Sequence, residues 1–249
     1  SINNEGEVKN LLGDIRKQKY VVSEIQKKES KRNPLPPFIT STMQQEASSK
    51  LRFSAKKTMM FAQQLYEGIE LGDDGTVGLI TYMRTDSTRL SDEIVSEVRE
   101  FIYAQYGKEY LPDEPRTFKV KKSSQDAHEA IRPTMLKYTP KSIKKFLTTE
   151  QFALYELIWN RFVACQMNPA ILETTTVFIE GGPFLFKAAN SIYTFRGFLQ
   201  VYDDSIEEEI IADEDPELAK KKIPTSLYEK QSVLLEELIP HQHFTKPPA

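Results

Sequence analysis

Hydrophobic side chains recur at spacings of three and four residues in the middle of the chain. In residues 91–106 and again in residues 148–163 they fall on one helical stripe, which predicts two amphipathic helices, the second largely buried. Gly107 follows the first stripe directly, and glycine commonly ends a helix. The middle of the chain is therefore predicted to be helical.

Polar side chains mark where helices should begin. Thr148 with Gln151 has the spacing of a capping box, and so has Ser41 with Gln44. Ser54 is placed to cap a further helix. These signals predict shorter helices ahead of the two longer ones.

Both ends of the chain have sequence patterns that are typical of β-strands. Residues 20–27 resemble an exposed strand after an expected helix at 5–17, and strand-like runs lie at 174–179, 184–187, 191–196 and 233–239. The predicted fold class is thus α+β and multidomain. A helical domain of residues 42–167 is inserted into a β-rich domain made of residues 1–41 and 168–249.

The composition excludes several classes of protein. Hydrophobic residues make up 39% and charged residues 28% of the 249, as in a globular protein. No run approaches the roughly 18 apolar residues of a membrane span, and the N-terminus has no signal-peptide stretch. One cysteine, Cys165, and three scattered histidines give neither a disulfide nor a zinc-ligand spacing. We therefore expect a cytoplasmic protein with no membrane partner and no metal bound to this chain.

The net charge of −3 conceals a strong asymmetry. Residues 116–145 contain nine basic and two acidic side chains, whereas residues 203–217 contain nine acidic and no basic ones. Clustered lysine and arginine attract phosphate by Coulomb attraction and counterion release. The basic segment is therefore a candidate for nucleic-acid binding, with a solvated basic face as the alternative.

Residues 78–87, GLITYMRTDS, begin as a short apolar strand and end in turn-forming residues. In an extended strand the side chains of Ile80, Tyr82 and Arg84 would share one side, and Met83 would face the other. A tyrosine oxygen can attack phosphorus, but its ordinary pKa of about 10 calls for a positive neighbour or a base. Arg84 is suited to that role and to holding two phosphate oxygens. Because such a pair is also common as a structural contact, residue types alone leave both interpretations open.

A second candidate cluster lies in residues 125–134, QDAHEAIRPT. Pro133 predicts that a short helical turn ends at Arg132, with His128 and Arg132 on one face. A histidine in this basic segment is suited to binding phosphate or relaying a proton. The alternative is a partly buried histidine hydrogen-bonded to backbone.

Both clusters resemble motifs of the type IA DNA topoisomerases. Residues 81–87, TYMRTDS, are similar to the active-site tyrosine motif, and residues 127–134, AHEAIRPT, are similar to a second motif that follows in the same order. Further similar stretches, which extend the resemblance over nearly the whole chain, are STMQQEA at 41–47, QQLYEG at 63–68 and HFTKPPA at 243–249. Met83 favours the bacterial topoisomerase I branch, because the topoisomerase III branch usually has proline there.

The resemblance implies roles for the matching residues. Tyr82 would form a 5′-phosphotyrosine bond with single-stranded DNA, Arg84 would hold the scissile phosphate and His128 would assist nearby. Arg132 is a further candidate for contacting the nucleic acid. The implied activity is the cleavage and rejoining of one DNA strand, which relaxes negative supercoils.

The resemblance also implies an architecture. In the family, the helical domain that bears the tyrosine is inserted into a β domain that arches over a hole of the size of DNA, and the arch opens to pass a strand. Family enzymes begin with a Toprim domain, whose acidic residues bind Mg²⁺ and whose glutamate and lysine complete the site. They continue into another DNA-binding domain.

This chain departs from the family pattern because no Toprim motif is present. Asp213 and Asp215 have a D-x-D spacing but lie in the acidic stretch, which we interpret as a solvated loop. The chain also ends at Ala249 without further domains or zinc ribbons. We expect an internal fragment that binds no Mg²⁺ and is inactive in relaxation without its Toprim and C-terminal domains.

Two other classes stay open at this point. A non-catalytic single-stranded DNA binding module would use the basic segment and the aromatic rings as a stacking surface. A tyrosine recombinase or type IB enzyme would also use a tyrosine nucleophile, but it would link to the 3′ phosphate. Whether the tyrosine is linked to a 5′ or a 3′ phosphate distinguishes these hypotheses.

Overall fold

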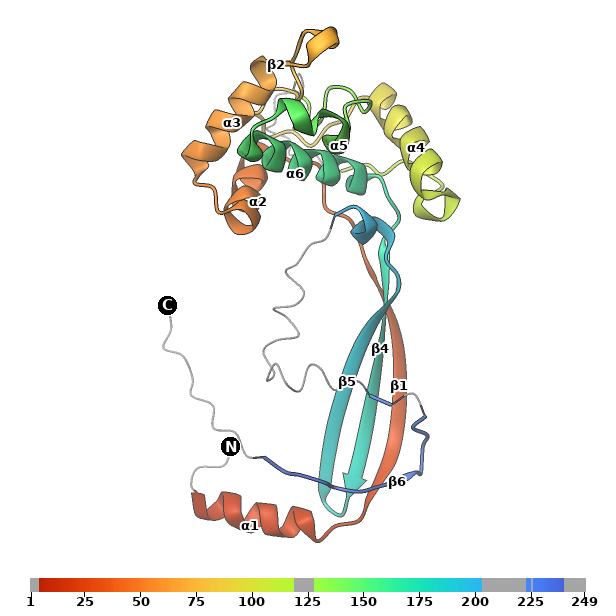
Figure 1. The fold of residues 1–249 in the computed structure, drawn as a ribbon. Helices are drawn as coiled ribbons and strands as arrows, with labels where there is room; N and C mark the ends of the chain where they lie inside the picture. Colours follow the sequence, from red (N-terminus) through yellow and green to blue (C-terminus); the bar gives the residue numbers. More distant parts are fainter. Residues whose placement is uncertain (1–4, 119–127, 203–222, 225, 240–249) are drawn as a thin grey trace. The chain divides into compact units, whose positions relative to one another are not determined.

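The computed structural model describes residues 5–118, 128–202, 223–224 and 226–239 (Figure 1). By its internal contacts the chain divides into two compact units. The β unit comprises residues 1–30, 172–193 and 207–249, and the helical unit comprises residues 31–171 and 194–206. A mixed α+β fold is therefore confirmed, while the domain borders predicted at residues 41 and 168 stay a prediction.

The helical unit contains all of the described helices except α1. Its α-helices are α2 (Thr40–Leu51), α3 (Ala55–Glu67), α4 (Asp92–Tyr106), α5 (Pro140–Ile143) and α6 (Thr149–Cys165). Its 3-10 helices are η1 (Gly72–Asp74), η2 (Lys108–Tyr110), η3 (Lys144–Phe146) and η4 (Gly197–Gln200). A small hairpin of β2 (Ile69–Glu70) and β3 (Thr76–Val77) follows α3.

The predicted helix starts are confirmed at three caps. The side chains of Ser54, Ser91 and Thr148 accept hydrogen bonds from backbone N–H groups in the first turns of α3, α4 and α6. The capping box predicted at Ser41 is wrong, because α2 already begins at Thr40 and the N–H of Ile39 donates to Thr42 Oγ1 at 3.1 Å. Hydrogen bonds of Thr40 to Met83 and Thr85 fix the start of this helix one residue before Ser41.

Helix α6 forms the centre of the helical core, as its apolar stripe predicted. It packs on α2, α3 and α5, and Leu154, Tyr155, Ile158 and Phe162 are fully buried. The hydroxyl of Tyr155 donates to the carbonyl of Tyr138 at 2.6 Å, so its one polar group is paired. Burial of these large side chains gives the unit a continuous hydrophobic core.

The β unit is built on a four-stranded sheet with the order β5-β4-β1-β6 (Figure 1). Its elements are α1 (Glu5–Arg16), β1 (Tyr20–Arg32), β4 (Ala170–Gly181), β5 (Phe184–Phe195) and β6 (Ser232–Val233), with the long strands crossing the border between the units. The runs predicted at 184–187 and 191–196 form one continuous strand. The run predicted at 233–239 is wrong beyond Val233, because only Ser232 and Val233 pair with β1.

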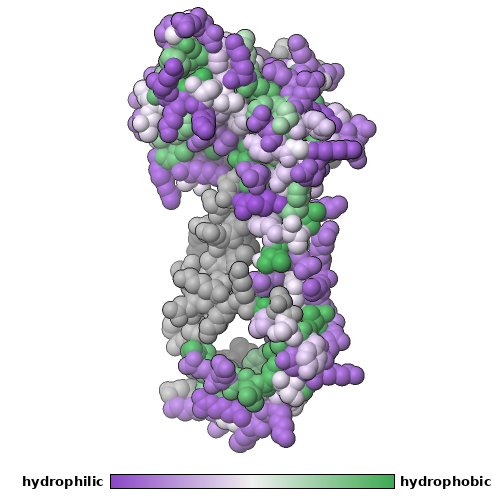
Figure 2. Space-filling model, turned by 45° about the vertical axis from the view of Figure 1, so that its right-hand side comes forward, coloured by the Kyte–Doolittle hydropathy of each residue, from purple (hydrophilic) through white to green (hydrophobic). Residues whose placement is uncertain are grey.

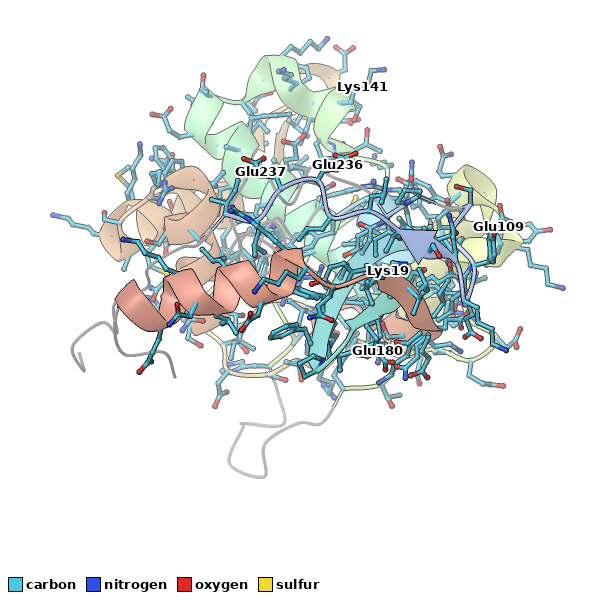
Figure 3. The ribbon with its side chains drawn as sticks, turned by 90° about the horizontal axis from the view of Figure 1, so that it is seen from below. Lys19, Glu109, Lys141, Glu180, Glu236 and Glu237 are labelled. Carbon is cyan, nitrogen blue, oxygen red and sulfur yellow. The ribbon has the colours of Figure 1, made fainter. Side chains whose placement is uncertain are left out.

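Tyr20 joins the parts of the β unit. Its hydroxyl donates to the carbonyl of Ile15 in α1 at 2.7 Å, and its ring packs edge-on against Phe186 of β5. Lys19 and Glu180, both labelled in Figure 3, mark this end of the sheet, next to the β4–β5 turn. Tyr20 thereby connects helix α1 to the sheet.

None of the helices in the described part of the chain is long and apolar enough to cross a membrane.

Candidate functional site

The two sequence motifs lie side by side in the helical unit. The N–H of Thr81 donates to the carbonyl of Arg132 at 2.9 Å, and the N–H of Thr134 donates to the carbonyl of Leu79 at 3.0 Å. Between them, Ile80 and Pro133 form an isolated antiparallel bridge. The strand predicted from residue 78 is therefore wrong in extent, because the N–H groups that would continue the pairing are bonded elsewhere: that of Arg132 donates to Thr81 Oγ1 and that of Leu79 donates to the carbonyl of Leu65.

A third segment, which leads into helix α2, completes the scaffold. The hydroxyl of Thr40 donates to the carbonyl of Met83 at 2.7 Å and accepts from the N–H of Thr85 at 2.9 Å. The N–H of Thr40 donates in turn to the carbonyl of Thr85, also at 2.9 Å. Phe38, two residues earlier, pairs with Ile131 of the second motif. The backbone on both sides of Arg84 is thus held by one threonine.

Side chains alternate strictly between solvent and core after this pairing. Tyr82, Arg84 and Asp86 are exposed, whereas Met83, Thr85 and Ser87 are buried. Tyr82 and Arg84 therefore face solvent while Met83 faces inward, as expected for extended backbone. The prediction that Ile80 shares the side of Tyr82 is wrong, since Ile80 is buried in the bridge with Pro133.

The ring of Tyr82 stands between two other rings. The ring centroids of Tyr82 and Tyr66 are 5.4 Å apart in an edge-on arrangement, and those of Tyr82 and His128 are 6.2 Å apart. Tyr82 is 42% exposed, and its hydroxyl makes no hydrogen bond to any other described residue. The phenol oxygen is therefore accessible to a ligand.

Arg84 and His128 line the same open groove, whose volume is about 610 Å³. The start of α2 forms another part of its wall through Thr40, Ser41 and Gln44. The guanidinium of Arg84 has no acidic partner among the described residues. A groove with a free guanidinium and a helix start is suited to an anion such as phosphate.

His128 is placed without the helical turn that the sequence predicted. Residues 128–130 have no regular structure, because the N–H groups of Ala130 and Ile131 are bonded to the carbonyls of Arg89 and Phe38. The prediction of a turn is thus wrong from residue 128 onward, and residues 125–127 lie outside the described part. The half-buried His128 ring makes no hydrogen bond to another described residue.

Arg132 is held by the protein itself. Its guanidinium donates to the Glu129 carboxylate at 2.6 and 3.0 Å and to the carbonyl of Pro133 at 2.9 Å. Its side chain is only 13% exposed. The structure thus brings Tyr82, Arg84 and His128 together and engages Arg132 in an ion pair, so a contact of Arg132 with nucleic acid stays a prediction.

The described residues do not form a metal centre. No group of three or more histidine, cysteine, aspartate or glutamate side chains in that part of the chain is placed to hold a metal ion. Asp213 and Asp215, and the central part of the basic segment at 119–127, lie outside the described residues. Asp86, the one carboxylate in the groove, has neither a second nor a third acidic partner there.

Sequence reasoning assigned no role to two residues that shape the site. Tyr66 contacts the Tyr82 ring, and Thr40 fixes the backbone around Arg84. Tyr66 belongs to the QQLYEG stretch and Thr40 precedes the STMQQEA stretch that carried the family resemblance. The resemblance was thus a signal that these segments matter, but it did not indicate their contacts.

Comparison with known proteins gives consistent matches. The family described as DNA topoisomerase matches residues 1–249. The chain is 48% identical over its whole length to DNA topoisomerase 1 of Rickettsia prowazekii, and spans 31% of that protein. It is 47% identical over 91% of its length to DNA topoisomerase 1 of Xylella fastidiosa, and spans 28% of it.

A solved structure extends the match to three dimensions. Full-length topoisomerase I from Thermotoga maritima superposes with a TM-score of 0.72 at 39% sequence identity, covering 90% of this chain and 34% of that one. The chain therefore spans about a third of the length of the proteins that it matches. With its two motifs adjacent in space and its whole length matched, the chain belongs to the DNA topoisomerase family, in the bacterial type IA branch.

Proposed function

We propose that this chain is the strand-cleaving part of a bacterial DNA topoisomerase I and that Tyr82 is its nucleophile. The observation that carries the proposal is the position of Tyr82. Its hydroxyl is free of hydrogen bonds to described residues, and its ring is next to His128. His128 lines a groove together with Arg84, which has no acidic partner among the described residues. An accessible phenol beside a phosphate-binding groove is what covalent attack on a DNA strand requires.

The reaction is a transesterification. The Tyr82 oxygen forms a bond to phosphorus while the bond from phosphorus to the O3′ of the adjoining nucleotide breaks. The phenol loses its proton, the departing O3′ gains one, and the strand remains attached to the enzyme by its 5′ phosphate. Rejoining reverses each step, so the number of phosphodiester bonds is conserved and the longer protein relaxes negative supercoils.

Arg84 and His128 have distinct parts in this proposal. The guanidinium of Arg84 holds two oxygens of the scissile phosphate and stabilises the negative charge that develops on them. His128 lies between the Tyr82 ring and the groove, where it assists phosphate binding or proton movement. Arg132, which is paired with Glu129, remains our candidate for a further contact with the strand beside this site.

The resemblance assigns Mg²⁺ to a Toprim domain outside this chain. The described residues offer no set of carboxylates that fits such an ion, so no step is assigned to metal within them. We propose that single-stranded DNA, the Toprim domain and the C-terminal domain are the partners of this chain, in the cytoplasm. The chain alone is expected not to relax DNA.

A second candidate function rests on the row of rings formed by Tyr66, Tyr82 and His128. Such rings can stack on successive bases, as in a non-catalytic single-stranded DNA binding module. Replacing the Tyr82 hydroxyl alone separates the two functions. Stacking survives in Tyr82→Phe, but covalent attack does not.

The test is adduct formation on labelled strands. The chain is mixed with a separately produced polypeptide that carries the Toprim domain, Mg²⁺ and a single strand labelled at its 5′ or 3′ end. We expect a denaturation-resistant adduct that retains the 3′ label, is lost in Tyr82→Phe and is unchanged in the matched control Tyr103→Phe. Tyr103 lies on α4 and is 56% exposed.

Retention of the 5′ label instead would show linkage to the 3′ phosphate and overturn the proposal. An adduct that persists in Tyr82→Phe would assign the nucleophile to another residue. If no adduct forms while Tyr82→Phe binds the strand as tightly as the unsubstituted chain, the binding-module function is favoured.

A further inference from the structure

We infer that Tyr66 is a positioning residue that fixes the ring of Tyr82 in the orientation needed for attack on the strand. The inference rests on the proposed function of Tyr82 and adds a residue from a different element. Tyr66 lies at the C-terminal end of α3, and its ring meets that of Tyr82 edge-on, with an interplanar angle of 64°. Aromatic rings at this distance and angle attract each other, and this attraction adds to the free energy gained by burying their surface.

The backbone holds the two tyrosines in this arrangement. The N–H of Leu79 donates to the carbonyl of Leu65 at 2.7 Å, and both leucines are fully buried. At Gly78 a Cβ atom would lie 2.7 Å from the carbonyl oxygen of Tyr66, so only glycine allows this close approach. The end of α3 and the segment leading to Tyr82 therefore behave as one rigid piece.

The side chain of Tyr82 has few other constraints. It is 42% exposed and its hydroxyl has no hydrogen bond to a described residue. An exposed aromatic side chain without a neighbour moves freely between rotamers. The rings of Tyr66 and His128 are the two aromatic contacts that limit this movement, and only Tyr66 is supplied by a helix packed into the core.

The contact depends on the ring of Tyr66, not on its hydroxyl. The Tyr66 hydroxyl makes no hydrogen bond to a described residue, and the side chain is 40% exposed. Tyr66→Phe keeps the ring contact and Tyr66→Leu removes it, while neither change opens a cavity in the core. The pair of variants therefore separates positioning from folding.

Two measurements test the inference on the full 249-residue chain. The first is the ¹⁹F resonance of 3-fluorotyrosine placed at position 82. The second is the single-turnover rate of adduct formation with the Toprim polypeptide, alongside the dissociation constant for the strand. Tyr103→Leu, a change of the same kind at an exposed tyrosine of α4, is the control.

We expect Tyr66→Leu to shift and sharpen the fluorine resonance and to slow adduct formation about three- to tenfold. This factor corresponds to the interaction free energy of one aromatic pair. The dissociation constant for the strand and the urea midpoint of the chain stay unchanged. Tyr66→Phe restores both the resonance and the rate, and Tyr103→Leu alters neither.

An unchanged rate in Tyr66→Leu would overturn the inference and leave the proposed function intact. An equal loss in Tyr66→Phe and Tyr66→Leu would assign the effect to the hydroxyl and also overturn it. If the unsubstituted chain forms no adduct, the proposed function fails separately. In that case the fluorine measurement still tests the contact. A resonance that does not change in Tyr66→Leu would exclude contact between the rings of Tyr66 and Tyr82.

Discussion

The helical unit and the β unit bury their hydrophobic side chains to very different degrees. The helical unit holds most of the buried side chains, whereas the described residues of the β unit include only four buried hydrophobic ones, Ile15, Tyr20, Val22 and Val177. The same unit leaves several large apolar side chains exposed, namely Val21, Leu185, Ile192, Tyr228, Leu234, Leu235 and Ile239. Green, hydrophobic surface is visible on the β unit in Figure 2.

The difference indicates how the two units are stabilised. In the helical unit, packing around α6 and hydrogen bonds such as those of Thr40 hold the segments that carry the site residues against a dense core. In the β unit, sheet hydrogen bonds and one aromatic side chain, Tyr20, replace most of such a core. The unit that carries the proposed site is thus the more densely packed one, which agrees with the fixed side-chain geometry that the proposed function needs.

The largest expected effect concerns the buried ion pair of the helical unit. Arg161, 4% exposed, donates to Glu46 at 3.1 Å, to the carbonyl of Pro36 at 2.7 Å and to the Tyr202 hydroxyl at 3.3 Å. Removing it leaves the buried carbonyl of Pro36 without this donor, and it leaves Glu46 with Lys50, at 3.3 Å, in place of two cations. Arg161→Ala is therefore expected to lower the free energy of unfolding by about 4 kcal/mol.

The measurement is urea unfolding followed by the fluorescence of the single tryptophan, Trp159, which lies in α6 and reports on the helical unit. Arg16→Ala, at an exposed position of α1 in the β unit, is the control and should change the midpoint little. Equal midpoints for Arg161→Ala and the unsubstituted chain would show that the pair contributes nothing.

The next effect compares glycine turns in the two units. At Gly197 of the helical unit, with φ +49°, a Cβ atom would lie 2.3 Å from the carbonyl oxygen of Pro169. At Gly182 of the β unit, with φ +57°, it would meet the flexible end of the Gln18 side chain at 2.4 Å. Backbone cannot move aside as a side chain can, so Gly197→Ala should cost about 3 kcal/mol and Gly182→Ala about 1 kcal/mol. Thermal unfolding by circular dichroism measures both, and the reverse order would contradict the comparison.

A third effect is a loss of stability at alkaline pH, which also belongs to the helical unit. Burial raises the pKa of the Cys165 thiol to about 12 and raises the pKa of the buried Tyr155 and Tyr202 hydroxyls above their ordinary values. The folded state therefore keeps protons that the unfolded state releases. The stabilisation is complete below pH 9, the ordinary value for the thiol, and is lost as pH rises toward 12.

Above its ordinary pKa, 9 for the thiol and 10 for the tyrosines, each such group lowers the free energy of unfolding by about 1.4 kcal/mol per pH unit. Urea midpoints at pH 7.5, 9 and 10 measure the slope, and Cys165→Ala should reduce it. A midpoint that is constant from pH 9 to 10 would mean that the Cys165 thiol ionises alike in the folded and unfolded chain.

Local patterns in the sequence predicted the helices better than they predicted the site. The caps at Ser54 and Thr148 depend on residues three positions apart, so a short window of sequence contains the whole interaction. The placement of Tyr82 and Arg84 on one side and of Met83 on the other also followed from strand alternation. A local pattern could not predict the pairing of residues 78–81 with 130–134, because the two segments are far apart in the sequence. This pairing buries Ile80 and replaces the helical turn that was expected at His128.

The same limit explains why two shaping residues were not assigned. Thr40 and Tyr66 act on Met83, Thr85 and Tyr82 across gaps of many residues, through contacts that only the folded chain brings together. A threonine before a helix and a tyrosine at the end of one are ordinary in sequence. Their significance comes from the partner that tertiary structure gives them.

The smallest expected effect sharpens the comparison from the side of the β unit. Leu234 is 93% exposed just beyond β6, so replacing it by a polar residue removes little buried surface. Leu234→Gln is therefore expected to change the free energy of unfolding by less than about 0.5 kcal/mol, as at other exposed sites. Val177→Ala, at a buried position of β4, should cost more, because it leaves a gap in the thin core of the same unit. Thermal unfolding of both variants tests this order. A loss of several kcal/mol in Leu234→Gln would mean that this apolar face is covered in solution and that the β unit has a larger core than its four buried side chains provide.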